Sequence, residues 1–291
     1  MKTMQELCNE TRRLAYGGMS EQINLIGVDA PAGADRLIFE MDVSPITPGM
    51  ILSSGLSVWY VKEVVQAART VYVVPGFDGS VKGAVLAGTV VYLKPRVTDW
   101  LLFNSLNDVI VQMSAPTNGL YMQGSWVAPV DSAWQTYTVP NDAKVMSLIG
   151  AQIRYPGSFD DWVDIPANSI HWQPENGVVR LTRNYNSGTE IKFNYRGAFI
   201  PAADMWWDVE LQCGLAPTMT DIPPLGAAVS LLRTTEARRS QIGPQGDPRR
   251  AAEVPGGSNS SIAREMDRDF KARINDEYAR LVNRNPITQS V

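Results

Sequence analysis

The chain has 291 residues, which at roughly 150 residues per domain predicts about two domains. Hydrophobic residues make up 44% and charged residues 19%, so the composition is that of a globular protein and excludes a disordered or fibrous chain. The net charge of −4 argues against a surface that wraps DNA phosphates, and the presence of only two cysteines excludes a disulfide framework and favours a reduced, intracellular history. No run of about 18 apolar residues occurs, so we expect no membrane-spanning segment and no membrane partner.

The first predicted helix covers residues 4–15. Thr3 and Glu6 form a T-x-x-E capping box at its start, and Gly17 and Gly18 end it. The residues expected on its buried face are Met4, Leu7, Cys8, Thr11, Leu14 and Ala15.

Between residues 22 and 96 the hydrophobic pattern has a period of two and is interrupted by prolines. Four or five short strands in this stretch predict a small barrel or meander. Residues 75–80 are expected to form a turn, because Asp78-Gly79 supplies the positive φ that a tight hairpin turn needs.

A second helix is predicted over 98–113, with Thr98 or Asp99 as its cap and an end before Pro116. Asn118-Gly119 marks the turn that follows. Its expected buried stripe consists of Leu102, Leu106, Val109, Ile110 and Met113, widened by Phe103.

Residues 120–211 form a second β-rich region. No amphipathic helix separates its strands, so the pattern favours an antiparallel sandwich over a βαβ fold. The predicted strands are 134–139, 144–155, 169–172, 178–182 and 190–196, with turns at 174–177 and 184–188.

Two further helices are predicted in the C-terminal part of the chain. The first begins at Pro223-Pro224 and runs to about residue 240, and the loop 243–257 is rich in glycine and proline. The second covers 260–284 and would be about 35 Å long at 1.5 Å per residue. Its apolar stripe is Ile262, Met266, Phe270, Ile274, Tyr278, Leu281 and Val282, and its mixed charges favour a salt-bridged surface or a protein interface over a DNA-binding arm.

The sequence offers few candidates for catalysis. Asp160, Asp161 and Asp164 surround Trp162, but no partner carboxylate for glycoside hydrolysis can be placed opposite them and their spacing matches no calcium loop. A solvated loop is the favoured interpretation. His171 is the only histidine, and its strand-like context favours a buried or half-buried structural residue over a catalytic base. We therefore expect no enzyme, no cofactor and no metal site.

Tryptophan is concentrated in and beside the second β-rich region. Most of these residues are expected in the core, although exposed aromatic platforms bind sugars and proteins. Trp206 and Trp207 would point to opposite faces of a strand, so one of them is an interface candidate, and we choose Trp207. The set is Trp126, Trp134, Trp162, Trp172, Trp206 and Trp207.

Several stretches, in the same order along most of the chain, resemble the head-to-tail adaptor (connector or neck) proteins of tailed bacteriophages. These are packing and turn motifs, and those of the first β-rich region (22–96) and the Asp247-Pro-Arg-Arg250 loop are the more specific ones. The stretches are 48–52, 58–61, 75–80, 88–96, 103–108, 118–121, 221–228 and 245–257.

The resemblance implies an α+β fold with a small four-helix core and two inserted antiparallel β domains. The core would comprise 1–20, 97–118 and 221–291, the barrel-like insertion 21–96 and the sandwich insertion 119–220. It further implies a structural virion protein at the head–tail junction, made in the host cytoplasm, that forms a dodecameric ring.

The partners implied by the resemblance are the portal protein, neighbouring adaptor subunits and the next neck or tail protein, while DNA passes the lumen without sequence-specific binding. Removing residues 259–291 is then expected to abolish portal binding and leave the sandwich folded. The alternative is a tail-associated carbohydrate- or receptor-binding sandwich. The residues selected for the partner interface are Arg249, Arg250, Arg264, Arg268, Lys271, Tyr278, Arg284, Ile287 and Trp207.

Overall fold

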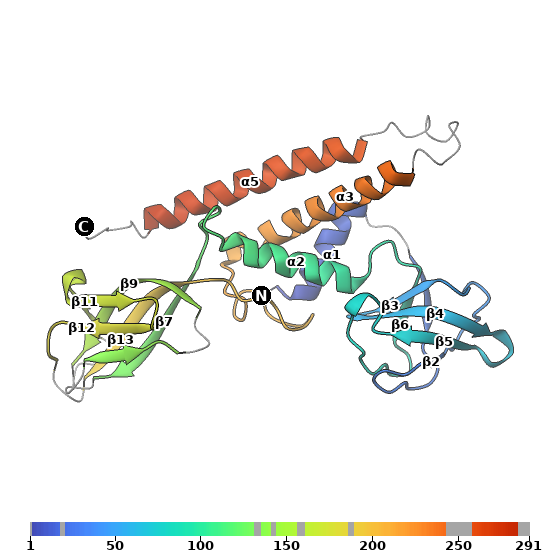
Figure 1. Cartoon of the computed structure of the whole chain (residues 1–291), viewed down its shortest axis with the longest axis horizontal. Helices are drawn as coiled ribbons and strands as arrows, with labels where there is room; N and C mark the ends of the chain where they lie inside the picture. Colours follow the sequence, from blue (N-terminus) through green and yellow to red (C-terminus); the bar gives the residue numbers. More distant parts are fainter. Residues whose placement is uncertain are drawn as a thin grey trace. The chain divides into compact units, whose positions relative to one another are not determined.

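The computed structural model describes residues 2–17, 21–130, 135–140, 144–155, 161–185, 189–242 and 258–284. It divides into two compact units, each assembled from three chain segments. Unit 1 comprises Met1–Val109, Ala202–Asp208 and Thr220–Phe270, and unit 2 comprises Ile110–Pro201, Val209–Met219 and Lys271–Val291. The fold is mixed α and β, with antiparallel sheets, as the sequence predicts (Figure 1).

The β part of unit 1 is a six-stranded antiparallel sheet curved into a half-barrel. Just beyond the ends of its two edge strands the chain segments are joined by hydrogen bonds, from Gly27 N to Ile38 O (2.8 Å) and from Glu40 N to Leu25 O (2.8 Å). Gly27 permits this approach, because a Cβ there would lie 3.1 Å from the backbone of Phe39. In order across the sheet the strands are β1 (Gln22–Leu25), β6 (Val90–Leu93), β3 (Ile51–Ser54), β4 (Ser57–Val65), β5 (Thr70–Pro75) and β2 (Arg36–Ile38).

The predicted turn after β5 is present, but it does not close a hairpin. Asp78 and Gly79 both have positive φ, at 57° and 74°. However, β5 and β6 are not neighbours in the sheet, and the tight hairpin instead joins β3 to β4 through Gly55. The interior of this sheet is filled by one cluster that includes Phe39, Leu52, Trp59 and Val71.

Helix α1 (Met4–Tyr16) begins with the predicted capping box between Thr3 and Glu6 and ends at Gly17, which has a φ of 72°. Met4, Leu7, Cys8 and Thr11 are buried as predicted. Leu14 was expected on the same face but is exposed, because the buried residues of α1 end at Thr11.

Helices α2 (Asp99–Met113), α3 (Ile222–Ile242) and α5 (Ser258–Arg284) complete the helical part, and α3 lies beside α1 (Figure 1). Within unit 1, α2, α3 and α5 meet closely at Gly226. A Cβ on Gly226 would lie 2.8 Å from both Val109 of α2 and Phe270 of α5. The predicted stripe of α2 is buried in full.

Unit 2 is an antiparallel sandwich, as predicted, of one four-stranded and one three-stranded sheet. Both sheets contribute to a single core, where the ring centroids of Tyr137 and Phe193 lie 5.2 Å apart. The first sheet has the order β10 (Val163–Ile165), β9 (Val145–Arg154), β13 (Glu190–Gly197) and β7 (Met122–Pro129), and the second has the order β11 (Ile170–Gln173), β12 (Val178–Leu181) and β8 (Thr136–Thr138).

Two strands of the sandwich were not predicted, β7 and β10. In β7 the side chains alternate between half-buried and exposed, and glycine, serine and proline weaken the hydrophobic pattern. Strand β10 has three residues, too few for an alternation to be recognised. Of the predicted strand 134–139, residue 134 lies outside the described residues.

Candidate functional site

Helix α5 carries most of the residues selected from the sequence. Met266, Phe270 and Leu281 are half-buried and Ile274 is buried, as expected. Ile262 and Tyr278 were expected on the same face but are 49% and 43% exposed. Ala263 and Glu277 are buried instead. The predicted stripe advances by four residues per turn, whereas an α-helix has 3.6, so the stripe leaves the buried face toward both ends of the helix.

Glu277 fixes the C-terminal half of α5 within unit 2. Its buried carboxylate lies 3.5 Å from both Arg273 and Arg280 and accepts a hydrogen bond from Thr218 Oγ1 at 3.3 Å. Arg273 also donates to the backbone carbonyl of Thr218 at 2.9 Å. These groups satisfy a charge that would otherwise be costly to bury.

The predicted interface residues of α5 that can be placed are exposed. Arg264 and Arg268 lie in the part that belongs to unit 1, and Lys271 and Tyr278 lie in the part that belongs to unit 2. For Arg284 only the backbone is described, and Arg249, Arg250 and Ile287 lie outside the described residues.

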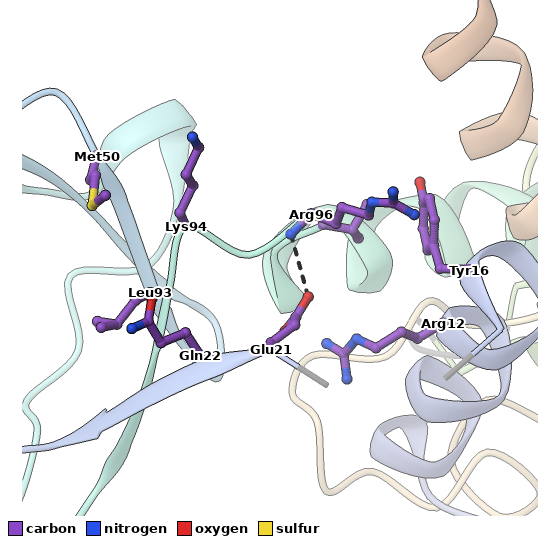
Figure 2. Close-up of a pocket in the computed structure, with 9 residues that line it drawn as sticks. Arg12, Tyr16, Glu21, Gln22, Met50, Leu93, Lys94 and Arg96 are labelled. Carbon is purple, nitrogen blue, oxygen red and sulfur yellow. Dashed lines mark hydrogen bonds between the residues drawn. The ribbon is translucent and has the colours of Figure 1, made fainter. Parts of the chain in front are cut away.

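A cationic cleft in unit 1, not predicted from the sequence, is a further candidate site. It has a volume of about 300 Å³ and lies between α1 and the sheet (Figure 2). Arg12, Lys94 and Arg96 contribute positive charge, and Glu21 contributes the negative charge. The remaining lining residues are Tyr16, Gln22, Met50, Leu93 and Val97.

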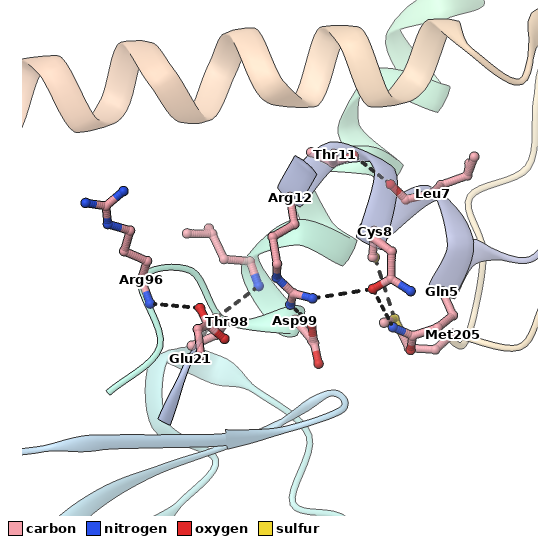
Figure 3. A network of polar contacts seen from close by, with 12 residues as sticks. Gln5, Leu7, Cys8, Thr11, Arg12, Glu21, Arg96, Thr98, Asp99 and Met205 are labelled. Carbon is pink, nitrogen blue, oxygen red and sulfur yellow. Dashed lines mark hydrogen bonds and ion pairs between the residues drawn. The ribbon is translucent and has the colours of Figure 1, made fainter. Parts of the chain in front are cut away.

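Arg12 is held at this cleft by a charged partner from another element. Its guanidinium forms an ion pair with Asp99, at the start of α2 (Figure 3). Burial raises the pKa of Asp99, and the Arg12 charge and hydrogen bond partly oppose that rise. The two residues are 87 positions apart in the sequence, so no local pattern could have paired them.

The opposite wall of the cleft is shaped by Lys94 and Arg96. Lys94 has a φ of 50°, in the left-handed region that disfavours residues with a side chain. The Arg96 guanidinium lies 5.9 Å from the centroid of the Tyr16 ring, and its backbone N donates to Glu21 Oε1 at 3.3 Å. Both side chains are exposed.

Cys8 lies buried beside the Arg12–Asp99 pair and contacts Met205 through sulfur (3.8 Å). Burial, reinforced by the negative charge of Asp99, raises the pKa of its thiol to about 12. Such a thiol stays protonated at neutral pH, so Cys8 is a packing residue and no nucleophile.

A second cleft, of about 540 Å³, lies in unit 2 between the 116–121 turn, the sheet and α5. Tyr278 closes one side of it by packing against Gly119, whose φ is 67° and whose Cβ, if present, would lie 2.7 Å from the Tyr278 ring. Arg196 covers the Tyr121 ring at 4.7 Å. The exposed Tyr278 is therefore part of a local wall as well as an interface candidate.

One member of the Trp206–Trp207 pair is exposed, as expected, but it is Trp206 and not the selected residue Trp207. Trp206 is 77% exposed, whereas Trp207 is half-buried. The pair lies in a turn and not in a strand, and Trp207 is fixed by the hydrogen bond from Met4 N to its carbonyl (3.0 Å). Trp126 and Trp172 are both half-buried and pack against the sandwich core, and Trp134 lies outside the described residues.

Trp162 packs against two cations, and the described aspartates beside it are exposed. Its ring is covered by Arg154 and Lys192, whose charged groups lie 5.1 and 5.9 Å from the ring centroid. Asp161 and Asp164 are exposed, Asp164 accepts a hydrogen bond from Gln152, and Asp160 lies outside the described residues.

His171 was expected to be buried or half-buried, and this is wrong. It points outward from β11, opposite Arg180 of β12, because the inward positions of this strand fall on its neighbours Ile170 and Trp172.

Within the described ranges, no group of three or more His, Cys, Asp or Glu side chains could hold a metal ion. Nor does any helix there have the length and hydropathy to cross a membrane. The chain matches no protein-family model and no curated protein.

Proposed function

We propose that the protein is a bacteriophage head-to-tail adaptor, a structural virion protein that forms a ring between the portal and the tail components. In this proposal the helices form a core from residues 1–20, 97–118 and 221–291, and the two β regions are insertions into it. Neighbouring subunits close the ring, the next neck or tail protein binds beyond it, and DNA passes through the lumen. The net charge of −4 is compatible with a lumen that does not retain DNA.

The observation that carries this proposal is the exposed, mixed-charge surface of α5. Its 27 residues extend about 40 Å at 1.5 Å per residue, and between residues 261 and 283 only Ala263, Ile274 and Glu277 are buried. A long helix with so little of its surface covered presents many side chains to a partner. The resemblance in motif order supplies the identity of that partner as the portal.

The test is electron microscopy of the purified protein mixed with portal rings from the same phage. The informative variant carries Arg264→Glu, Arg268→Glu and Lys271→Glu, because these side chains are exposed and their replacement leaves the buried residues of α5 in place. We expect the wild type to form a second ring stacked on the portal and the variant to leave portal rings bare.

A matched control reverses three exposed charges on the half-barrel, in Arg36→Glu, Lys62→Glu and Lys82→Glu. This control has the same net charge as the α5 variant and should still form the stacked ring. Bare portals with the wild type would refute the adaptor proposal, and stacked rings with the α5 variant would refute the role of α5.

A second candidate, a tail-associated carbohydrate- or receptor-binding protein, is favoured by the exposure of Trp206. Of the tryptophans that the structure describes, it is the one classed as exposed, and aromatic faces of this kind bind sugar rings. Binding to a glycan array that is lost in Trp206→Ala would support this candidate, and an array without bound protein would exclude it.

A further inference from the structure

We propose that the cationic cleft of unit 1 binds a carboxylate side chain from an acidic segment of another protein. This proposal does not depend on α5 or on the adaptor function. It rests on the charge, the shape and the backbone of the cleft.

The charges of the cleft leave two cations available for a ligand. Arg12 is neutralised by Asp99, and its guanidinium is thereby held in place. Lys94 and Arg96 form no ion pair with any of the residues that the structure describes, although a carboxylate, Glu21, lies in the same cleft. In Figure 2 the Lys94 ammonium lies on the sheet side and the Arg96 guanidinium beside Tyr16. Each of these groups binds carboxylates through charge-assisted hydrogen bonds.

The shape of the cleft favours a peptide over a nucleic acid. Its apolar lining, from Met50, Leu93 and Val97, suits the methylene groups and neighbouring aliphatic side chains of a peptide. A volume of about 300 Å³ admits one or two side chains, whereas a nucleic-acid strand needs a series of cations along its backbone.

The backbone conformation at Lys94 points to the same site. A lysine with φ of 50° directly before Pro95 is strained, and strain of this kind is concentrated at binding and catalytic sites. Here it lies at the end of β6 and fixes the direction in which the lysine leaves the sheet.

The experiment titrates the full-length protein into a fluorescein-labelled pentapeptide of sequence LEIEL, acetylated and amidated at its ends, and follows fluorescence anisotropy at low salt. The control peptide is LQIQL. We expect saturable binding of LEIEL, at least tenfold weaker binding of LQIQL, and at least tenfold weaker binding of LEIEL to the double variant Lys94→Gln/Arg96→Gln.

Exposed cations of the same unit outside the cleft provide the matched variant, Arg36→Gln/Lys62→Gln, which should bind LEIEL like the wild type. Zero-length carbodiimide coupling gives an independent readout, because it joins a bound carboxylate to an adjacent amine. Mass spectrometry should locate the peptide on Lys94 in preference to Lys62.

Equal binding of both peptides, equal binding to the cleft variant, or no saturable binding would each overturn the proposal. A twelve-nucleotide single strand that displaces LEIEL and binds more tightly would assign the cleft to nucleic acid instead. Retained circular dichroism and thermal unfolding in the exposed-residue variants separate lost binding from lost folding.

Discussion

At the scale of single residues, the Arg12–Asp99 ion pair affects the pKa of Cys8 as well as that of Asp99 itself. The Asp99 carboxylate adds to the effect of burial on Cys8 and raises the pKa of that thiol, while the guanidinium of Arg12 acts in the opposite direction. The same guanidinium opposes the burial that raises the pKa of Asp99. Arg12 therefore opposes the rise in pKa of both Asp99 and Cys8, but the pKa of Cys8 still rises to about 12 and its thiol remains protonated.

We predict that Cys8 in the folded protein reacts with Ellman's reagent at pH 8 at least about a thousandfold more slowly than an ordinary thiol, because its raised pKa lowers the thiolate fraction by about that factor and its side chain is fully buried. The measurement uses a Cys213→Ala background and follows absorbance with and without denaturant. Denaturant should restore a fast reaction, and an equally fast reaction of the folded protein would contradict the prediction.

The same shift gives the direction of a pH effect on folding. Because the pKa of Cys8 is higher in the folded state, its contribution to stability is complete below the ordinary thiol pKa of 9.0 and is lost as the pH rises toward 12.

Which residues could be predicted depended on whether their role was local. The Thr3–Glu6 cap was predictable because both partners lie within one turn. Asp99 was assigned only a capping role, and its pairing with Arg12 requires two helices to meet. A strand at Trp206 and Trp207 predicts one outward-facing side chain without identifying it, and the chain makes a turn there that exposes Trp206.

At the scale of elements, the closest helix contact is at Gly226. Here α3 has no side chain, and Val109 of α2 and Phe270 of α5 fill the space that a Cβ would occupy. A glycine inside a helix costs about 1 kcal/mol relative to alanine, so its presence is explained by packing and not by helix propensity.

We predict that Gly226→Ala destabilises the protein even though alanine favours the helix. The new Cβ would lie 2.8 Å from two side chains, and such overpacking costs about 1–3 kcal/mol, which exceeds the gain in propensity. Urea unfolding followed by tryptophan fluorescence measures the change. Ser230→Ala, at an exposed position of the same helix, should change the unfolding free energy by less than about 0.5 kcal/mol. A stabilised Gly226→Ala variant would contradict this packing.

The helices were predicted to within about two residues at each end, because caps, prolines and periodicity act over a few residues. Strands with one buried face, such as β13, were found by alternation. Strand β7 was not predicted because its inward side chains are only half-buried. Its glycine, serine and proline therefore leave no clear alternation of hydrophobic and polar residues in the sequence.

At the scale of the whole molecule, the β-rich regions and the mixed α and β class followed from the sequence, but strand order and the cleft did not. The cleft joins α1, β1, β6 and the segment before β3, which are brought together only by the folded sheet. Its residues carry no shared motif.

The division of α5 between the units changes what a truncation is expected to do. Ile274 and Glu277 are buried in unit 2, with the sandwich, so removing residues 259–291 removes part of its packing and is no clean test of portal binding. We predict that ending the chain at Phe270 destabilises the sandwich, seen as loss of dispersed amide signals from β7 to β13 in NMR spectra. Ending it at Arg284 keeps every described contact of α5 and should leave those signals unchanged. Unchanged spectra after both truncations would show that the sandwich needs no helix.

Because each unit is assembled from three chain segments, unit 2 can be completed only late in translation. The last strand ends at Gly197, yet unit 2 still lacks Ile274 and Glu277, which are buried in the finished protein. At about 5–20 residues per second, translation takes roughly 4–15 seconds to cover that distance. Throughout this interval unit 2 is without the part of α5 that contributes Ile274 and Glu277. The synthesis of α5 is therefore the step that completes unit 2.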